Sequence, residues 1–173
     1  MRNLFIFLLL LVFNTANAQI KNNGYNNLTW SQSKEQIRNL SNCNSNQTGA
    51  GFEICEFQSK DSIFIGKYKY NFISIRFFQN KLSEIQFDIA HKDIANIIAE
   101  LTIQYGKPII KEKNELGVEG EEATIGYVWE LGDTHMLIIN DGKLSPSICV
   151  LSSIKIKKTY PPNTLSLEQL IFE

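Results

Sequence analysis

His91 lies in the one segment of the chain whose charged residues are spaced for acid–base or metal chemistry, because Asp88 and Asp93 flank it closely. A metal site or a catalytic dyad here needs a further partner at a recognised spacing, and the sequence offers none. We therefore interpret the aspartates as acidic groups near a helix start, where the helix dipole favours negative charge. His135, the second histidine, lies on a predicted strand beside a hairpin turn. We predict no catalytic and no metal-ligating residue.

The sequence also lacks the motifs that usually announce an enzyme. It contains no Gly-x-Ser-x-Gly elbow, no Gly-rich phosphate loop and no His-Glu-x-x-His. An acidic run lacks the residue order of a calcium loop and is interpreted as a solvated loop; its members are Glu112, Glu115, Glu119, Glu121 and Glu122. We predict a protein that is not an enzyme and has no cofactor.

The three cysteines are Cys43, Cys55 and Cys149. A disulfide between Cys43 and Cys55 would close the polar segment 44–51, which has little else to hold it, and we favour this pairing. Three buried thiols, or a pairing that involves Cys149, are the alternatives. Cys149 lies in an apolar strand-like run, where a buried thiol is the simplest interpretation.

Two groups of residues are candidates for binding a partner. On the predicted strand 72–78, Phe72, Arg76 and Phe78 share the face opposite Ile73, Ile75 and Phe77, and aromatic and Arg side chains are frequent binding anchors. Cross-strand packing, or coverage by the C-terminal tail, is the alternative. The second group lies in the tail itself and comprises Leu167, Leu170, Ile171 and Phe172. These side chains are expected to dock either on this protein's own sheet, which we favour, or on a partner.

The apolar periodicity defines the elements that position these residues. Ser33 and Gln36 have the spacing of a capping box and predict a short helix over 33–41. Alternation over 73–77 and 85–89 predicts a hairpin with one buried face. A helical stripe predicts a helix over 92–105, ended by Gly106 and Pro108. Further alternation predicts strands from Ile109 to Ile156, with a hairpin at Gly132-Asp133.

Helix then strands, followed by helix then strands, predicts an α+β fold. We expect two layers, an antiparallel sheet with two helices packed on one face, and an internal duplication of the helix-plus-sheet unit. The predicted organisation is a signal peptide over 1–18, a flexible arm over 19–28, a single α+β domain over 29–158 and a C-terminal tail over 159–173.

The signal peptide is predicted from Arg2, the apolar run from Leu4 to Phe13 and the Ala16-x-Ala18 cleavage pattern. The run is too short for a good membrane span, so we expect no transmembrane segment in the mature chain. No Cys follows the cleavage point, which predicts a periplasmic or secreted protein without a lipid anchor.

The amino-acid composition and net charge argue against nucleic acid as a binding partner. The chain has 173 residues, of which 43% are hydrophobic and 20% are charged, as in ordinary globular proteins. Lys and Arg number 17 and Asp and Glu 18, so no basic field exists to hold nucleic acid.

The segment Trp30-Ser31-Gln32-Ser33-Lys34-Glu35-Gln36-Ile37 resembles the Trp-Gly-Met-Ser-x-x-Glu-Val opening of many small exported bacterial proteins of unassigned function, although Ser31 and Gln32 depart from it. Leu101 to Pro108 and Trp129 resemble their later Leu-x-x-x-Tyr-Gly-x-Pro motif and Trp-bearing strand. The helix-then-strands unit also resembles the BamE family of outer-membrane assembly lipoproteins and the β-lactamase inhibitory proteins. The resemblance implies a bacterial envelope protein that acts by contact.

The expected function is therefore protein–protein contact with another envelope or secreted protein. The alternative hypothesis is a carrier of a small apolar ligand, with a pocket between the helices and the sheet.

Overall fold

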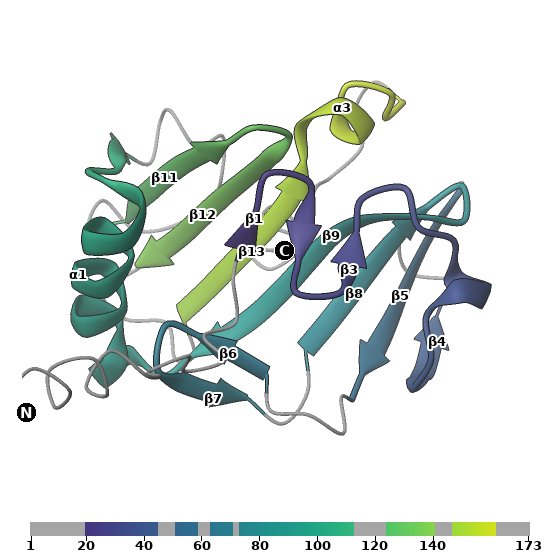
Figure 1. Ribbon diagram of the computed structural model, residues 1–173, viewed down its shortest axis with the longest axis horizontal. Helices are drawn as coiled ribbons and strands as arrows, with labels where there is room; N and C mark the ends of the chain where they lie inside the picture. Colours follow the sequence, from purple (N-terminus) through teal and green to yellow (C-terminus); the bar gives the residue numbers. More distant parts are fainter. Residues whose placement is uncertain are drawn as a thin grey trace, which may run out of the picture.

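The computed structural model of the chain describes residues 20–44, 51–58, 63–70, 73–112, 124–140 and 147–161 (Figure 1). Its main feature is an eight-stranded antiparallel sheet in the order β10-β11-β12-β13-β9-β8-β5-β4. These strands are β4 (Leu40–Asn44), β5 (Phe52–Phe57), β8 (Ile73–Phe78), β9 (Lys81–Ile89), β10 (Ile109–Glu112), β11 (Ile125–Leu131), β12 (Thr134–Asn140) and β13 (Ser147–Ser153).

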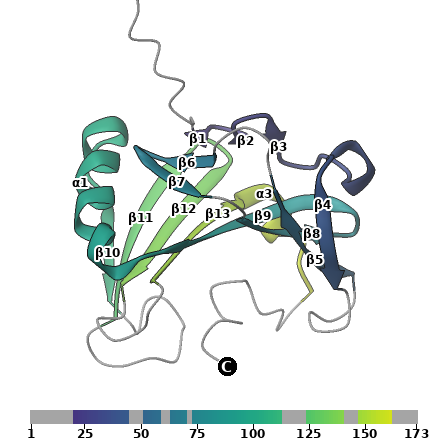
Figure 2. The ribbon, with the colours of Figure 1, turned by 90° about the horizontal axis from the view of Figure 1, so that it is seen from below.

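Two small sheets and one long helix lie on one side of this sheet, which we call the main face (Figures 1 and 2). The small sheets are β1 (Ile20–Lys21) with β2 (Gly24–Tyr25) and β3 (Leu28–Thr29), and β6 (Ile63–Ile65) with β7 (Tyr68–Tyr70). Helix α1 (Ile94–Tyr105) follows the single-turn η2 (His91–Asp93) and lies at the β10 end of the sheet. The remaining short helices are η1 (Lys34–Gln36) and α3 (Ile154–Lys157).

The main face carries the principal core, and the predicted alternation identified it correctly. Ile73, Ile75 and Phe77 are buried on β8, and Ile85 and Phe87 are buried on β9. The turn between these strands falls at Gln79-Asn80, both with positive φ. The predicted second helix and the hairpin at Gly132-Asp133 are confirmed as α1 and the β11–β12 turn.

The predicted α+β fold with two helices on one face is wrong, because the protein is mostly β and only α1 is a full helix among the described residues. The predicted helix 33–41 is reduced to the single turn η1. Its Ser33–Gln36 contact forms, with the Ser33 N–H donating to Gln36 Oε1 at 3.0 Å, but Ile37 is already extended and Asn39 has a positive φ of 65°. A capping box thus started a turn that lacked the apolar face needed to continue. Without a first helix, no helix-plus-sheet duplication exists.

The segment predicted as a flexible arm is part of the fold. Ile20, Tyr25 and Leu28 are buried in the principal core. Thr134 Oγ1 accepts hydrogen bonds from the N–H of Gly24 and from Trp30 Nε1, and donates to the carbonyl of Lys21. One buried hydroxyl on β12 therefore fixes β1–β3 to the main sheet.

The end of the chain after β13 also differs from the prediction. Alternation predicted that Ile154 and Ile156 continue a strand, but Ser153 caps a helical turn by accepting the N–H of Ile156 at 3.2 Å. Helix α3 then leads to Tyr160. The chain therefore leaves the sheet after Ser153, three residues before the predicted end of the strand at Ile156.

Candidate functional site

The opposite side of the sheet, which we call the reverse face, holds two of the residues predicted to bind a partner. Arg76 and Phe78 are 1% and 4% exposed, so neither lies on an open surface. Arg76 pairs across the β8–β9 hairpin with Glu84, and its Nη1 lies 3.3 Å from Glu84 Oε2. The Arg76 guanidinium also stacks on the Phe52 ring, 4.2 Å from its centroid.

Tyr160 covers this pair from the C-terminal side. Its ring packs edge-on against Phe52 and Phe78 at 4.9 Å, and its hydroxyl donates to Glu84 Oε1 at 3.2 Å. Burial, and then the nearby Glu84 carboxylate, raise the pKa of Tyr160 well above its usual value, so the hydroxyl stays protonated and remains a donor. The cluster is buried and holds the Arg76–Glu84 pair within it, although Arg76 Nε has no hydrogen-bond partner among the described residues, and it corrects the premise that Arg76 and Phe78 form an exposed face.

The other predicted binding residues lie outside the described residues. They are Phe72, Leu167, Leu170, Ile171 and Phe172. Sequence reasoning did not single out Glu84 and Tyr160. The predicted hairpin places Glu84 on the strand that pairs with the strand of Arg76, so their opposite charges were a detectable signal. Nothing in the sequence places Tyr160 against Glu84.

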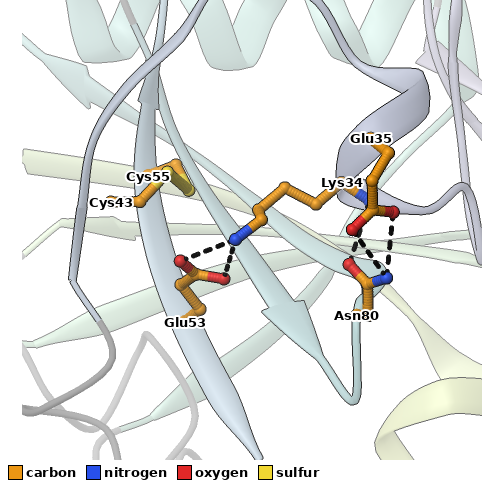
Figure 3. Close-up of polar contacts among 6 residues, drawn as sticks. All are labelled: Lys34, Glu35, Cys43, Glu53, Cys55 and Asn80. Carbon is orange, nitrogen blue, oxygen red and sulfur yellow. Dashed lines mark hydrogen bonds and ion pairs between the residues drawn. A yellow bond between two sulfur atoms is a disulfide. The ribbon is translucent and has the colours of Figure 1, made fainter.

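The predicted disulfide between Cys43 and Cys55 is confirmed and joins edge strand β4 to β5 (Figure 3). Beside it, Lys34 Nζ lies 2.7 Å from Glu53 Oε2. Asn80 Nδ2 donates to both carboxylate oxygens of Glu35, and this hydrogen bonding is the main reason that the pKa of Glu35 is lowered. These contacts attach η1 to the β5 and β8–β9 region.

Cys43, Glu53 and Cys55 form the one group in the described part of the chain whose ligand atoms would suit a metal, all within 4.8 Å of one another. Both sulfurs are bonded to each other, so neither is a free thiolate ligand. Cys149 is free and fully buried on β13, as its apolar interpretation predicted, and burial raises the pKa of its thiol.

The group of Asp88, His91 and Asp93 does not form an enclosed site, because Asp88 and His91 are exposed. Asp88 accepts a hydrogen bond from Gln86 Nε2 at 3.0 Å. Asp88 and Asp93 line a cavity of about 340 Å³ together with Lys69, Tyr68 and Tyr70. Ile73 and Ala90 also line the cavity, so it offers a ligand both charged and apolar groups.

His135 lies on β12 with its side chain on the reverse face and is half-buried. Glu112 ends β10, and the other four members of the acidic run lie outside the described residues.

The clearest exposed apolar surface lies at edge strand β10. Ile109 and Ile110 are 55% and 62% exposed, and they point to opposite faces of the sheet because they are consecutive in a strand. Ile110 pairs with Tyr127, which makes the 36%-exposed Ile125 its diagonal neighbour on the same face. Ile103, at 87%, lies on α1 just before the turn into β10. β10 pairs with β11 on one side, and no strand of the described residues pairs with its other side.

Sequence reasoning missed this edge. The signal was present, since Ile109-Ile110 follows Pro108 directly, but an apolar pair of this kind is equally typical of a buried strand. Only the strand order shows that β10 is outermost.

Comparison with known proteins finds no matching family model, no matching curated protein and no matching solved structure. The resemblance to exported bacterial proteins therefore stays a prediction. No helix in the described part of the chain is long and apolar enough to cross a membrane.

Proposed function

We propose that this chain is an exported bacterial envelope protein that acts by binding another protein, without a catalytic step, and that the partner adds a strand to β10. The observation that carries the proposal is the exposure of Ile109 and Ile110 on an outermost strand.

An edge strand presents N–H and C=O groups in the register that a further strand requires. Most edge strands carry charged or irregular residues that discourage such pairing. β10 carries Lys111 and Glu112 in its second half, but its first half exposes Ile109 and Ile110. Its register with β11 is uninterrupted from Ile109 to Glu112, so its backbone is regular. A partner segment with alternating β-branched residues would bury one isoleucine on each face, while main-chain hydrogen bonds supply affinity.

The export part of the proposal draws on two further observations. Residues 1–18 have the sequence pattern of a cleaved signal peptide. The Cys43–Cys55 disulfide is compatible with an oxidising compartment outside the cytoplasm.

The test compares three forms of the exported protein, each purified after its N-terminal mass has been measured. The first is the native chain, the second carries Ile109→Lys with Ile110→Lys, and the third carries Ser41→Lys with Asn42→Lys on the opposite edge strand. Each carries a photo-reactive side chain at Lys107, beside β10, and cross-linked partners are identified by mass spectrometry.

We expect a mature chain that begins at Gln19 and one partner captured by the native and β4-edge forms. The β10-edge form should lose that partner, with an affinity at least tenfold weaker in a binding titration. Equal capture by all three forms would refute the β10 contact, and a retained Met1 would refute export by cleavage.

A further inference from the structure

A second apolar patch lies on the reverse face, opposite the principal core and next to β10, whose Ile109 pairs with one of its members, Val128. Its members are Val128, Leu137, Ile139, Ile148 and Val150, which we call the reverse patch. Val128, Leu137 and Val150 form one cross-strand row over β11, β12 and β13, and Ile139 and Ile148 form the next row. The patch therefore consists of two apolar clusters that lie side by side on three neighbouring strands.

Every member of the reverse patch is at most 4% exposed, although it faces away from the principal core. Among the described elements, β1–β3, β6–β7 and α1 all lie on the main face, and Figure 2 shows no described helix or strand across the opposite side. Side chains this deeply buried need a cover, because a sheet face cannot exclude water by itself.

Tyr160 shows which part of the chain reaches this face. It packs on Phe52 and Phe78 and hydrogen-bonds to Glu84, all on the reverse face. Glu84 pairs with Ser152, which is two residues from Val150 of the reverse patch and points to the same face. By residue 160 the chain therefore lies on the reverse face. Its contact residue Glu84 belongs to the cross-strand row of Ser152, which is next to the row of Val150 in the reverse patch.

Residues 162–173 follow directly and carry five large apolar side chains: Leu165, Leu167, Leu170, Ile171 and Phe172. From β8, where Tyr160 sits, to β11 is four strand spacings, or about 19 Å. Twelve residues span about 18 Å as a helix and about 40 Å when extended. An extended segment can reach β11, and a helix reaches β13 and β12 and stops close to β11.

We propose that residues 162–173 of this chain dock on the reverse patch as its built-in cover. Docking closes the reverse face to other proteins and leaves β10 as the apolar surface open to a partner. The inference does not depend on the proposed function, since it concerns an intramolecular contact on a face of the sheet and not the addition of a strand to its edge.

The first experiment truncates the exported protein after Pro161, which retains Tyr160. We expect the melting temperature to fall by several degrees and the fluorescence of an apolar-surface probe, 1-anilinonaphthalene-8-sulfonate, to rise several-fold. A synthetic peptide of residues 162–173 added in trans should reverse both changes, and the same peptide with Leu167→Asp and Leu170→Asp should not.

A full-length variant with Leu167→Asp and Leu170→Asp keeps the test decisive if the truncated chain does not fold. It should reproduce the lower melting temperature and the probe binding as a monomer. An unchanged melting temperature with no added probe binding in either variant overturns the proposal. So does a native chain that sedimentation shows to be a dimer whose dissociation alone exposes the patch, because a second copy is then the cover.

Discussion

The eight-stranded sheet ends in β4 on one side and in β10 on the other, and of these two edge strands only β10 exposes large apolar side chains. β4 exposes Ser41, Asn42 and Asn44, whereas β10 exposes Ile109 and Ile110. The β4–β5 register shifts between Ser41 and Asn44, while the β10–β11 register is continuous. Polar side chains and an irregular register are the devices by which proteins discourage edge pairing.

The two edges are also held by different means. β4 is held by a covalent bond from Cys43 to Cys55 and by the hydrogen bond from Asn42 Nδ2 to Glu56 at 2.8 Å. At the β10 end of the sheet lies α1, whose Leu101 is buried in the principal core, and Trp129 Nε1 on the neighbouring β11 donates a hydrogen bond to the carbonyl of Gly106 at 2.8 Å. The β4 edge is thus fixed by a disulfide and exposes polar side chains. The β10 edge has no covalent link among the described residues and exposes apolar side chains, as a strand that binds a partner requires.

The largest expected effect comes from removing the support of the β10 edge. Leu101→Ala deletes a side chain that is 1% exposed and should lower the free energy of unfolding by about 2–5 kcal/mol. Hydrogen exchange should speed up in β10 and β11 more than in β4 and β5. Urea unfolding and exchange mass spectrometry measure both effects.

Ile103→Ala on the exposed side of the same helix is the matched control, and its change should stay within about 0.5 kcal/mol. If Leu101→Ala loosens both edges equally, the two edges are not supported independently and the comparison fails.

Removing the covalent staple of the β4 edge should have the next largest effect. The double variant Cys43→Ala with Cys55→Ala should lose about 2–4 kcal/mol of stability in urea unfolding, because the bond restricts the unfolded chain. Exchange should increase in β4 while β10 is unchanged. A reducing agent should destabilise the native protein by a similar amount and leave the double variant unaffected, and any response of the double variant would contradict this assignment.

The smallest effect is expected from the ion pair beside the staple. The side chains of Lys34 and Glu53 are 34% and 26% exposed, so Lys34→Met should cost about 0.2–1 kcal/mol. The loss should shrink in high salt because screening already weakens the native pair. Lys34→Arg, which keeps the charge, serves as the control in parallel urea titrations at two salt concentrations. A loss as large as that of the disulfide variant would show that charge, and not the covalent bond, secures this edge.

Several features of this protein were determined by local sequence. Ile73, Ile75 and Phe77 specified a buried strand face because side chains alternate in an extended chain. The stripe of Ile94, Ile97 and Leu101, followed by Gly106, specified α1 and its end. Cys43 and Cys55 were close enough in the chain for their pairing to be favoured before the fold was seen.

Other features were decided by contacts between segments far apart in the chain. The same alternation placed Arg76 on an outer face, yet Tyr160, 84 residues later, helps to bury it with Glu84. The short strands at Ile20–Thr29 have little periodicity and depend on Thr134, more than a hundred residues away. Strand order makes β10 an edge and Ile109 exposed. Periodicity reports which side chains share a face, but whether that face or edge is covered depends on which distant segment lies against it, and only the tertiary structure contains that information.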